Sequence, residues 1–301
     1  MIASNTTPKI IRSSRHPNIA HRLVRLSLGV FACLLAGLTT SAFAMKIGFD
    51  SQHAWQLILS GSTVAGDAEK LARTLLAPLP DKPFLAAEIV LNSEGGDLNE
   101  AVRIATLIKG LHLDTRVRGG DRCASACFLI FLAGDKRIAG ERVGGAMRQG
   151  RIGLHRPFLN PEAFKKADPT IAIARQQHEM RKLTEYLRNE NVPLRLIDEM
   201  MGHASNDIYW MSNDDMWQLG EYNPGLEEIL IARCGYDKRY TSASYEKLLP
   251  TLDEENRKKG FTQLATLLKC IVDTRGLLDA KREAFIKKLQ TGWRPWSDIK
   301  K

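Results

Sequence analysis

From residue 55 onward, short apolar runs alternate with longer segments in which apolar residues recur every three or four positions. The short runs predict strands at 55–59, 84–91, 113–117, 151–155 and 207–211. The longer segments predict helices at 67–76, 98–108, 163–189, 193–201 and 213–219. Such alternation is typical of the α/β class, in which helices cover a largely parallel sheet.

The same pattern indicates which side chains form the core. In the helix at 67–76 one face holds four apolar residues: Ala68, Leu71, Ala72 and Leu75. The run at 84–91 is nearly continuous in apolar residues, as in a strand that is buried on both faces. In the long helix at 163–189 an inward stripe is expected at Ile173, Met180, Leu183 and Leu187.

The first 44 residues differ from the rest of the chain. They contain five basic residues and no acidic residue, then an apolar run at 26–38, and they end in Ala42-Phe43-Ala44. This order is typical of a secretory signal peptide that is cleaved before Met45, and the apolar run is short for a membrane span. We therefore expect a periplasmic or secreted protein. The alternative is an uncleaved segment that anchors the chain in the inner membrane.

The chain is accordingly expected to have three parts. A signal peptide occupies 1–44, an α/β domain occupies 45–222, and a mainly helical extension, basic and cysteine-bearing, occupies 223–301.

The positive charge of the chain comes largely from its N-terminus. The predicted signal peptide carries five of the 43 basic residues and none of the 34 acidic ones, so the formal charge falls from +9 to +4 without it. No cluster of lysine and arginine interleaved with aromatic residues is present, so the sequence does not predict a nucleic-acid-binding protein.

Four cysteines follow the predicted signal peptide, in a chain that is expected to meet an oxidising compartment. The simplest pairing joins Cys234 to Cys270 and Cys123 to Cys127. The second pair is only four residues apart, where disulfide geometry is demanding, so two small buried thiols remain an equal alternative. The absence of paired CxxC and HExxH motifs disfavours zinc, and no cofactor is expected.

Ser125 has a setting that suggests nucleophilic chemistry. It lies in the sequence Cys-Ala-Ser-Ala-Cys at 123–127 and is expected to begin a helix, where free backbone N–H groups favour negative charge. His155 follows 30 positions later, in Leu-His-Arg-Pro at the end of a predicted strand. A serine hydroxyl becomes a good nucleophile only when a base takes its proton, so this pair suggests an acyl-transfer site.

The motifs follow one another in a definite order: a strand that ends in Leu-Asn-Ser-Glu-Gly-Gly at 91–96, a helix, a strand, the serine turn, and Leu-His-Arg-Pro. This order resembles the ClpP-like serine peptidases of the ClpP/crotonase superfamily, and most of all their secreted bacterial relatives. The resemblance covers about 55–220 and implies a spiral of ββα units. Glu94 stands where ClpP itself has proline.

In that family a serine is the nucleophile, a histidine is the general base, and an aspartate on a later strand orients the histidine. The resemblance therefore implies these roles for Ser125, His155 and Asp207. Asp207 is one residue out of register with the family pattern, and its neighbours Ser205 and Asn206 could be confused with it.

The resemblance also implies an oxyanion hole formed by the backbone N–H groups of Gly96 and Ala126. Donors fixed in this way stabilise the negative oxygen of a tetrahedral intermediate. Two other histidines, His178 and His203, are interpreted as structural, with His203 as the alternative base because of its position near Asp207.

The leading hypothesis is an exported serine endopeptidase that hydrolyses unfolded proteins or peptides. Because the periplasm lacks ATP, no ATP-driven unfoldase partner is expected, and the resemblance implies a homo-oligomer. One alternative is a catalytically inactive binding or scaffold protein of the same fold. Two others are an acyl-CoA enzyme of the crotonase type, against which export argues, and a Ser/Lys dyad with Lys136 or another lysine as base.

Overall fold

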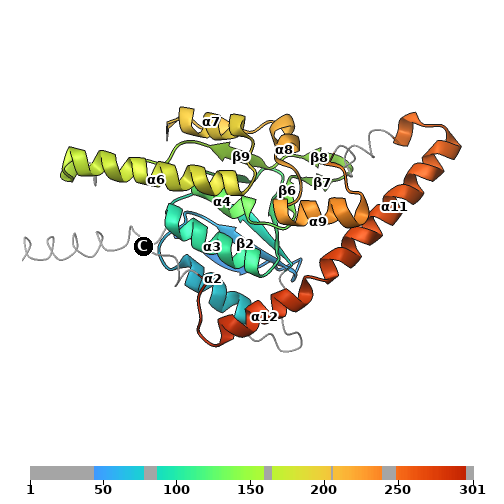
Figure 1. The fold of residues 1–301 in the computed structure, drawn as a ribbon, viewed down its shortest axis with the longest axis horizontal. Coiled ribbons are helices and arrows are strands. Elements are labelled where there is room, and N and C mark those ends of the chain that lie inside the picture. Colours follow the sequence, from blue (N-terminus) through green and yellow to red (C-terminus); the bar gives the residue numbers. More distant parts are fainter. Residues whose placement is uncertain (1–43, 78–86, 159–164, 205, 239–248, 296–301) are drawn as a thin grey trace, which may run out of the picture. The chain divides into compact units, whose positions relative to one another are not determined.

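The computed structural model describes residues 44–77, 87–158, 165–204, 206–238 and 249–295 (Figure 1). The described residues belong to one structural unit. Apart from Ala44, the predicted signal peptide lies outside the described residues. So do Ser205, the first part of the strand predicted at 84–91 and the first two residues of the helix predicted at 163–189. Within the described ranges, no helix has both the length and the apolar composition needed to cross a membrane.

A five-stranded sheet forms the centre of the fold. Its strands lie in the order β1 (Lys46–Phe49), β2 (Gln56–Ser60), β3 (Glu88–Asn92), β4 (Asp114–Val117) and β6 (Arg137–Ala139). All neighbours are parallel except β1, which pairs with β2 in the antiparallel sense. Because the strands are parallel, the loops that follow β2 and β3 emerge at the same edge of the sheet.

A second, smaller sheet has the order β10 (Tyr209–Trp210), β9 (Arg151–Leu154) and β5 (Arg122–Ala124). Strands β5 and β9 are parallel, with Cys123 opposite Ile152 and Ala124 opposite Gly153. A bridge between Ser93 and Cys123 joins this sheet to the end of β3. A separate hairpin is formed by β7 (Glu141–Val143) and β8 (Ala146–Arg148).

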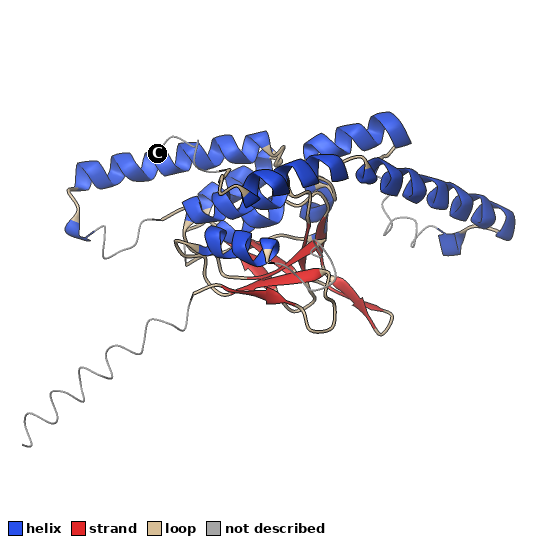
Figure 2. Cartoon of the chain, turned by 90° about the horizontal axis from the view of Figure 1, so that it is seen from below, coloured by secondary structure: helices blue, strands red, loops and turns tan. Residues whose placement is uncertain are grey.

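Helices gather on one side of the strands, as Figure 2 shows. Those of the α/β part are α2 (Asp67–Leu76), α3 (Leu98–Gly110), α4 (Ala126–Leu132), α6 (Pro169–Asn189), α7 (Leu194–Gly202) and α8 (Asn213–Leu219). Every residue of α4 is buried, so this short helix runs through the centre of the main hydrophobic core.

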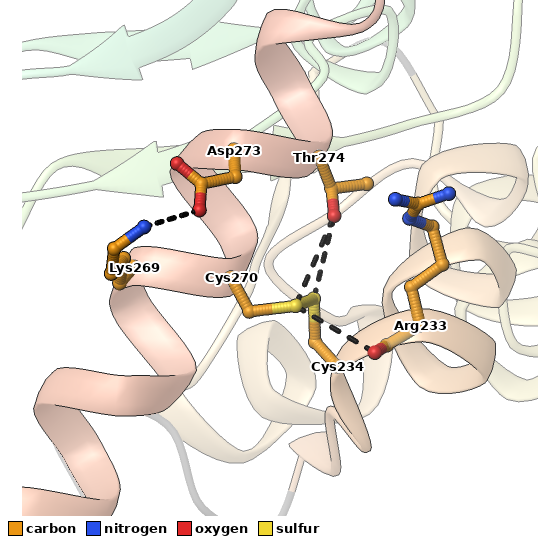
Figure 3. The surroundings of a disulfide bond; sticks show 6 residues. All are labelled: Arg233, Cys234, Lys269, Cys270, Asp273 and Thr274. Atoms are coloured by element: carbon orange, nitrogen blue, oxygen red, sulfur yellow. Dashed lines mark hydrogen bonds and ion pairs between the residues drawn. A yellow bond between two sulfur atoms is a disulfide. The ribbon is translucent and has the colours of Figure 1, made fainter.

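The described residues of the C-terminal part include α9 (Pro224–Cys234), α11 (Glu254–Gly276) and α12 (Asp279–Gln290), with a 3-10 turn η2 at Leu249–Thr251. The α/β class with a helical C-terminal part, as predicted, is confirmed. A disulfide joins Cys234 at the end of α9 to Cys270 in α11, close to the hydroxyl of Thr274 (Figure 3). The predicted pairing of these two cysteines is confirmed.

The C-terminal helices are bound to the α/β part by two arginines. Arg275 in α11 donates to both carboxylate oxygens of Asp114, at 3.1 and 2.6 Å. Arg282 in α12 donates to the carbonyl oxygens of Leu111 and His112, at 2.8 and 3.0 Å, just beyond the end of α3. These carbonyls have no partner within α3, so α12 supplies the cap that the helix end needs.

One detail of the predicted core is wrong. Ile173 is half exposed, with 50% of its surface accessible, whereas Ala172 beside it is buried together with Leu183 and Leu187. At about 100° per residue, Ala172 lies about 20° from the direction of Leu183, but Ile173 lies about 80° away. At the N-terminal end of α6, the buried position is therefore Ala172, one residue before the predicted Ile173.

Candidate active site

The turn at Ser125 connects β5 to α4. Ser125 has φ 57° and ψ −127°, which places a non-glycine residue in a region that L-amino acids rarely adopt. Such a conformation costs on the order of 1–3 kcal/mol and is usually retained only where the surroundings determine it. A sharp strand-to-helix turn of this kind exposes a side chain at the helix N-terminus.

Hydrogen bonds from three segments hold this turn. The N–H of Ser125 donates to the carbonyl oxygen of Gly153 at 3.0 Å, and the N–H of Phe128 donates to the carbonyl of Ser125 at 2.9 Å. One residue earlier, the N–H of Ala124 donates to the carbonyl of Ser93 at 3.0 Å. The hydroxyl of Ser125 does not cap α4, so its oxygen is not used to stabilise the helix.

A disulfide between Cys123 and Cys127 spans the turn, with the two Cα atoms 5.2 Å apart. Of the two alternatives that the sequence left open, the bridge is therefore the one that forms. Both cysteines are fully buried.

The glycine turn after β3 packs directly against Ser125. Gly95 has φ +100°, and a Cβ atom placed on it would lie 2.6 Å from the Cβ of Ser125 and 2.9 Å from the nitrogen of Ala126. On Gly96, with φ +139°, a Cβ atom would lie 2.2 Å from the carbonyl oxygen of Thr63. Neither position can accept a side chain, because each approaches backbone atoms too closely.

Thr63 holds the glycine turn in place. Its N–H donates to the carbonyl of Gly95 at 2.8 Å, and its carbonyl accepts from the N–H of Asp97 at 2.9 Å. In this parallel bridge the N–H of Gly96 points away from Thr63. Among the described residues, neither that N–H nor the N–H of Ala126 donates a hydrogen bond. Two donors thus remain available beside Ser125.

His155 follows β9, the strand that is parallel to the one before Ser125. Only 6% of its surface is exposed, and its ring lies 5.9 Å from that of Phe158, measured between ring centroids. The Nδ1 atom lies 2.9 Å from the carbonyl oxygen of Arg156. Because a carbonyl oxygen only accepts, Nδ1 carries the proton, and the lone pair of the neutral ring lies on Nε2.

Ser125 and His155 line one cleft of about 630 Å³, together with Gly96 and Ala126. Three buried apolar side chains from different helices also line it: Leu129, Leu183 and Met200. Four of the five residues for which the sequence predicted a catalytic or oxyanion-hole role are therefore brought together.

Asp207 is the exception. It does not line the cleft, and its side chain is 69% exposed. Its carboxylate contacts Nδ1 of His203 at 2.8 Å, while Nε2 of His203 lies 3.3 Å from the carboxylate of Glu199. The structure thus pairs Asp207 with the histidine that was interpreted as structural, and not with His155.

Other polar groups of the cleft were missed by sequence reasoning. Arg175, Gln176 and Glu179 come from α6, and Thr63 follows β2, whose end lies at the same sheet edge as the glycine turn. The hydroxyl of Thr63 is buried and has no hydrogen-bond partner among the described residues. The spacing of Arg175 and Glu179, four residues apart, is the signal that could have placed both on one side of α6.

The far end of α4 is stabilised by a buried cation. Arg137 donates from Nε to the carbonyl oxygen of Leu132 at 3.0 Å, and its guanidinium lies 3.8 Å from the carboxylate of Glu190. Burial lowers the pKa of Arg137 to about 10, so the group stays charged at neutral pH. A positive charge at the C-terminus of a helix is favourable, and here it supports the helix that begins at Ser125.

Lys136, the base of the alternative dyad, lies beyond α4. It contacts Glu221 at 3.8 Å and the ring of Tyr222 at 5.8 Å. Among the described residues, no lysine lines the cleft of Ser125.

No family model matches the chain, and no curated protein matches its sequence. Among the solved structures that are similar to it, three illustrate the degree of likeness. ClpP1 from Listeria monocytogenes and a point mutant of that protein show 18% and 19% identity, with TM-scores of 0.35 and 0.36, over 55% of this chain and 86% of theirs. A mutant of 1510-N, a membrane-bound stomatin-specific protease, shows 16% identity and a TM-score of 0.38, over 62% of this chain and 87% of its own. Similarity this low says nothing about the activity of this chain.

Proposed function

We propose that this chain is an exported serine peptidase in which Ser125 is the nucleophile and His155 is the general base. One observation carries the proposal: both residues line a single cleft, beside the uncommitted N–H groups of Gly96 and Ala126. A strained serine turn at a helix N-terminus, a buried histidine with a free Nε2 and a pair of backbone donors are the parts that acyl transfer requires.

The reaction would proceed in two stages. Nε2 of His155 takes the proton of Ser125 as Oγ attacks the carbonyl carbon of the substrate, and the protonated ring then gives that proton to the departing amine. The N–H groups of Gly96 and Ala126 stabilise the oxyanion that forms in between. Water then hydrolyses the acyl-enzyme by the same route.

The orienting role belongs, in this proposal, to a backbone group. The carbonyl oxygen of Arg156 holds Nδ1 of His155 at 2.9 Å and fixes the tautomer that leaves Nε2 as the base. A carbonyl is neutral, so it stabilises the imidazolium less than a carboxylate does. We therefore expect slower acylation than an enzyme with a complete Ser/His/Asp triad would give.

The substrates are proposed to be unfolded proteins or short peptides. Export, which is part of this proposal, places the chain where no ATP-driven unfoldase operates, and the two disulfides are compatible with an oxidising compartment. The floor of the cleft, formed by Leu129, Leu183 and Met200, would receive an apolar side chain of the substrate. A homo-oligomer remains part of the proposal.

The test is hydrolysis of a fluorogenic peptide library and of a reduced, unfolded protein by the full chain. Ser125→Ala and His155→Ala should each lower kcat by roughly 10³-fold or more. His178→Ala is the matched control, because His178 is an exposed histidine of α6 and does not line the cleft. Equal hydrolysis by wild type and by Ser125→Ala would exclude the proposal.

A second candidate is a non-catalytic binding protein that keeps the cleft. It is favoured by one observation, the engagement of Asp207 by His203 instead of His155. If wild type cleaves nothing in the library while the cleft still binds peptides, and if Met200→Trp weakens that binding, the binding protein is the better account.

A further inference from the structure

The Cys123–Cys127 disulfide joins the two residues that lie two positions before and two positions after the proposed nucleophile, Ser125. Cys123 is the middle residue of β5 and Cys127 is the second residue of α4, so the bridge ties the end of a strand to the first turn of a helix across Ser125. Both cysteines are fully buried and belong to the main core.

The turn needs such a constraint for two reasons. First, Ser125 adopts φ 57° and ψ −127°, which a serine backbone disfavours. Second, a serine at a helix N-cap ordinarily uses its side-chain oxygen to bind the first free N–H groups of the helix, and Ser125 does not. The hydroxyl is left free for chemistry, and the first turn of α4 loses its usual cap.

We propose that the Cys123–Cys127 disulfide positions Ser125, so that the serine site is assembled only in the oxidised protein. This inference rests on the proposed function and adds its regulation. In the newly made chain Cys123 and Cys127 are still thiols, so the turn at Ser125 is less constrained and the activity is low. Formation of the bridge removes two electrons and two protons from the thiols and transfers them to a disulfide oxidant, R–S–S–R, which leaves as two R–SH.

The consequence is a peptidase that becomes active where such oxidants are present. In a reducing compartment the dithiol form prevails, and in an oxidising one the bridge forms. Because the sulfurs of Cys123 and Cys127 are buried, the folded, oxidised form is protected from reductants once it has formed.

The second disulfide of the chain serves as a control for the general effect of removing a disulfide. The second disulfide, between Cys234 and Cys270, joins α9 to α11, and neither cysteine lines the cleft. Removal of either bridge alters the chain entropy of the unfolded state, but only removal of the first alters the turn at Ser125.

The experiment compares two double variants of the full chain, C123A/C127A and C234A/C270A, with wild type. Two quantities are measured for each protein. The first is the first-order rate constant of inactivation by a fluorophosphonate, determined separately from the binding constant of the probe. The second is the hydrogen-exchange rate of the Ser125 and Phe128 amides. These amides donate the hydrogen bonds that define the turn. C123S/C127S provides a second variant if the alanine form does not fold.

We expect C123A/C127A to lose at least about tenfold in the inactivation rate constant, equivalent to about 1.4 kcal/mol, with an unchanged binding constant. Exchange at Ser125 and Phe128 should accelerate by a similar factor, while C234A/C270A should match wild type in both quantities. Unchanged exchange at both amides in C123A/C127A would overturn the inference.

The two proposals fail in different ways. If wild type does not react with the fluorophosphonate but exchange at Ser125 and Phe128 accelerates only in C123A/C127A, the peptidase proposal fails and the positioning role of the bridge stands. If wild type reacts and C123A/C127A reacts at the same rate, the peptidase proposal stands and the positioning role fails.

Discussion

The carboxylate of Asp207 lies 2.8 Å from Nδ1 of His203, and this contact separates it from the cleft that contains His155. The two residues are four positions apart, and Asp207 is exposed while His203 is partly buried, so the contact is a local one. His155 meanwhile donates to the backbone carbonyl of Arg156. The histidine of the proposed dyad is thus oriented without a carboxylate.

Replacement of Asp207 should therefore have little effect on catalysis. For Asp207→Asn we expect kcat to change by less than about fivefold, because Asp207 does not line the cleft and contacts His203 instead of His155. His203→Gln should behave alike, since it removes the partner of the same pair. A loss of roughly 100-fold or more in Asp207→Asn, measured in steady-state peptide hydrolysis, would show that Asp207 orients His155 during turnover.

Gly95 should not tolerate even alanine. A Cβ atom at this position would lie 2.6 Å from the Cβ of Ser125 and 2.7 Å from the carbonyl oxygen of Ala124, so Ser125 must shift. Gly120→Ala is the matched control, because Gly120 also has a positive φ, +90°, but nothing lies within 4 Å of its Cβ position.

In urea unfolding, Gly120→Ala should lose about 1–2 kcal/mol from backbone strain alone. Gly95→Ala should lose more than this and should also react with a fluorophosphonate at least about tenfold more slowly than Gly120→Ala, a loss of about 1.4 kcal/mol in transition-state stabilisation. Equal effects of the two changes on stability and labelling would contradict the close packing of the glycine turn on Ser125.

Arg282 is expected to attach the C-terminal part to the α/β part. In Arg282→Met the carbonyl groups of Leu111 and His112 lose their partner, which should lower the free energy of unfolding by about 1–3 kcal/mol. Lys281→Met, at an exposed neighbour, should stay within about 0.5 kcal/mol of wild type. If the two variants unfold at the same urea concentration, α12 does not cap α3 in solution.

Asp50 should make the stability sensitive to acid. A hydrogen bond from Arg118 is the main cause that lowers the pKa of Asp50 from 3.8 to about 2, with further help from the backbone N–H groups of Gln52 and His53. The folded state therefore binds this proton more weakly than the unfolded state does. The resulting stabilisation is fully present above about pH 4 and is lost as the pH falls toward 2.

Asp50→Asn removes this contribution. The difference in unfolding free energy between wild type and Asp50→Asn should therefore shrink between pH 5 and pH 2, as measured by urea titration at each pH. Asp198→Asn is the control, because Asp198 is exposed and its side chain makes no ion pair or hydrogen bond to another described residue, so its difference from wild type should stay near zero throughout. A difference for Asp50→Asn that is constant with pH would contradict the lowered pKa.

Sequence patterns predicted the longer elements well. The bounds of α2 and α8 agree with the predicted helices, and the four apolar residues chosen for the inner face of α2 are all buried. The grouping of Gly96, Ser125 and His155 was expected from the order of their motifs and the resemblance that this order carries, and all three line one cleft.

The structure differs from the sequence-based predictions mainly where the local sequence pattern carries little information. Strand β5 has three residues and is stabilised by pairing with β9 and with Ser93, both distant in sequence. A period of two cannot be read from three residues. Asp207 contacts His203, four residues before it in the sequence, and His155 contacts the carbonyl oxygen of Arg156. The contact of Asp207 is local, between residues four positions apart, whereas the resemblance assigned Asp207 to a histidine that is distant in sequence.

Labelling of Ser125 by a fluorophosphonate tests the central claim most directly. The oxidised full chain is treated with the probe, digested and mapped by mass spectrometry, beside Ser125→Ala and His155→Ala. The account predicts one modified peptide in wild type, with the adduct on Ser125, none in Ser125→Ala and strongly slowed labelling in His155→Ala. No adduct on Ser125 in the folded, oxidised wild type, or the same adduct yield in Ser125→Ala, would contradict it.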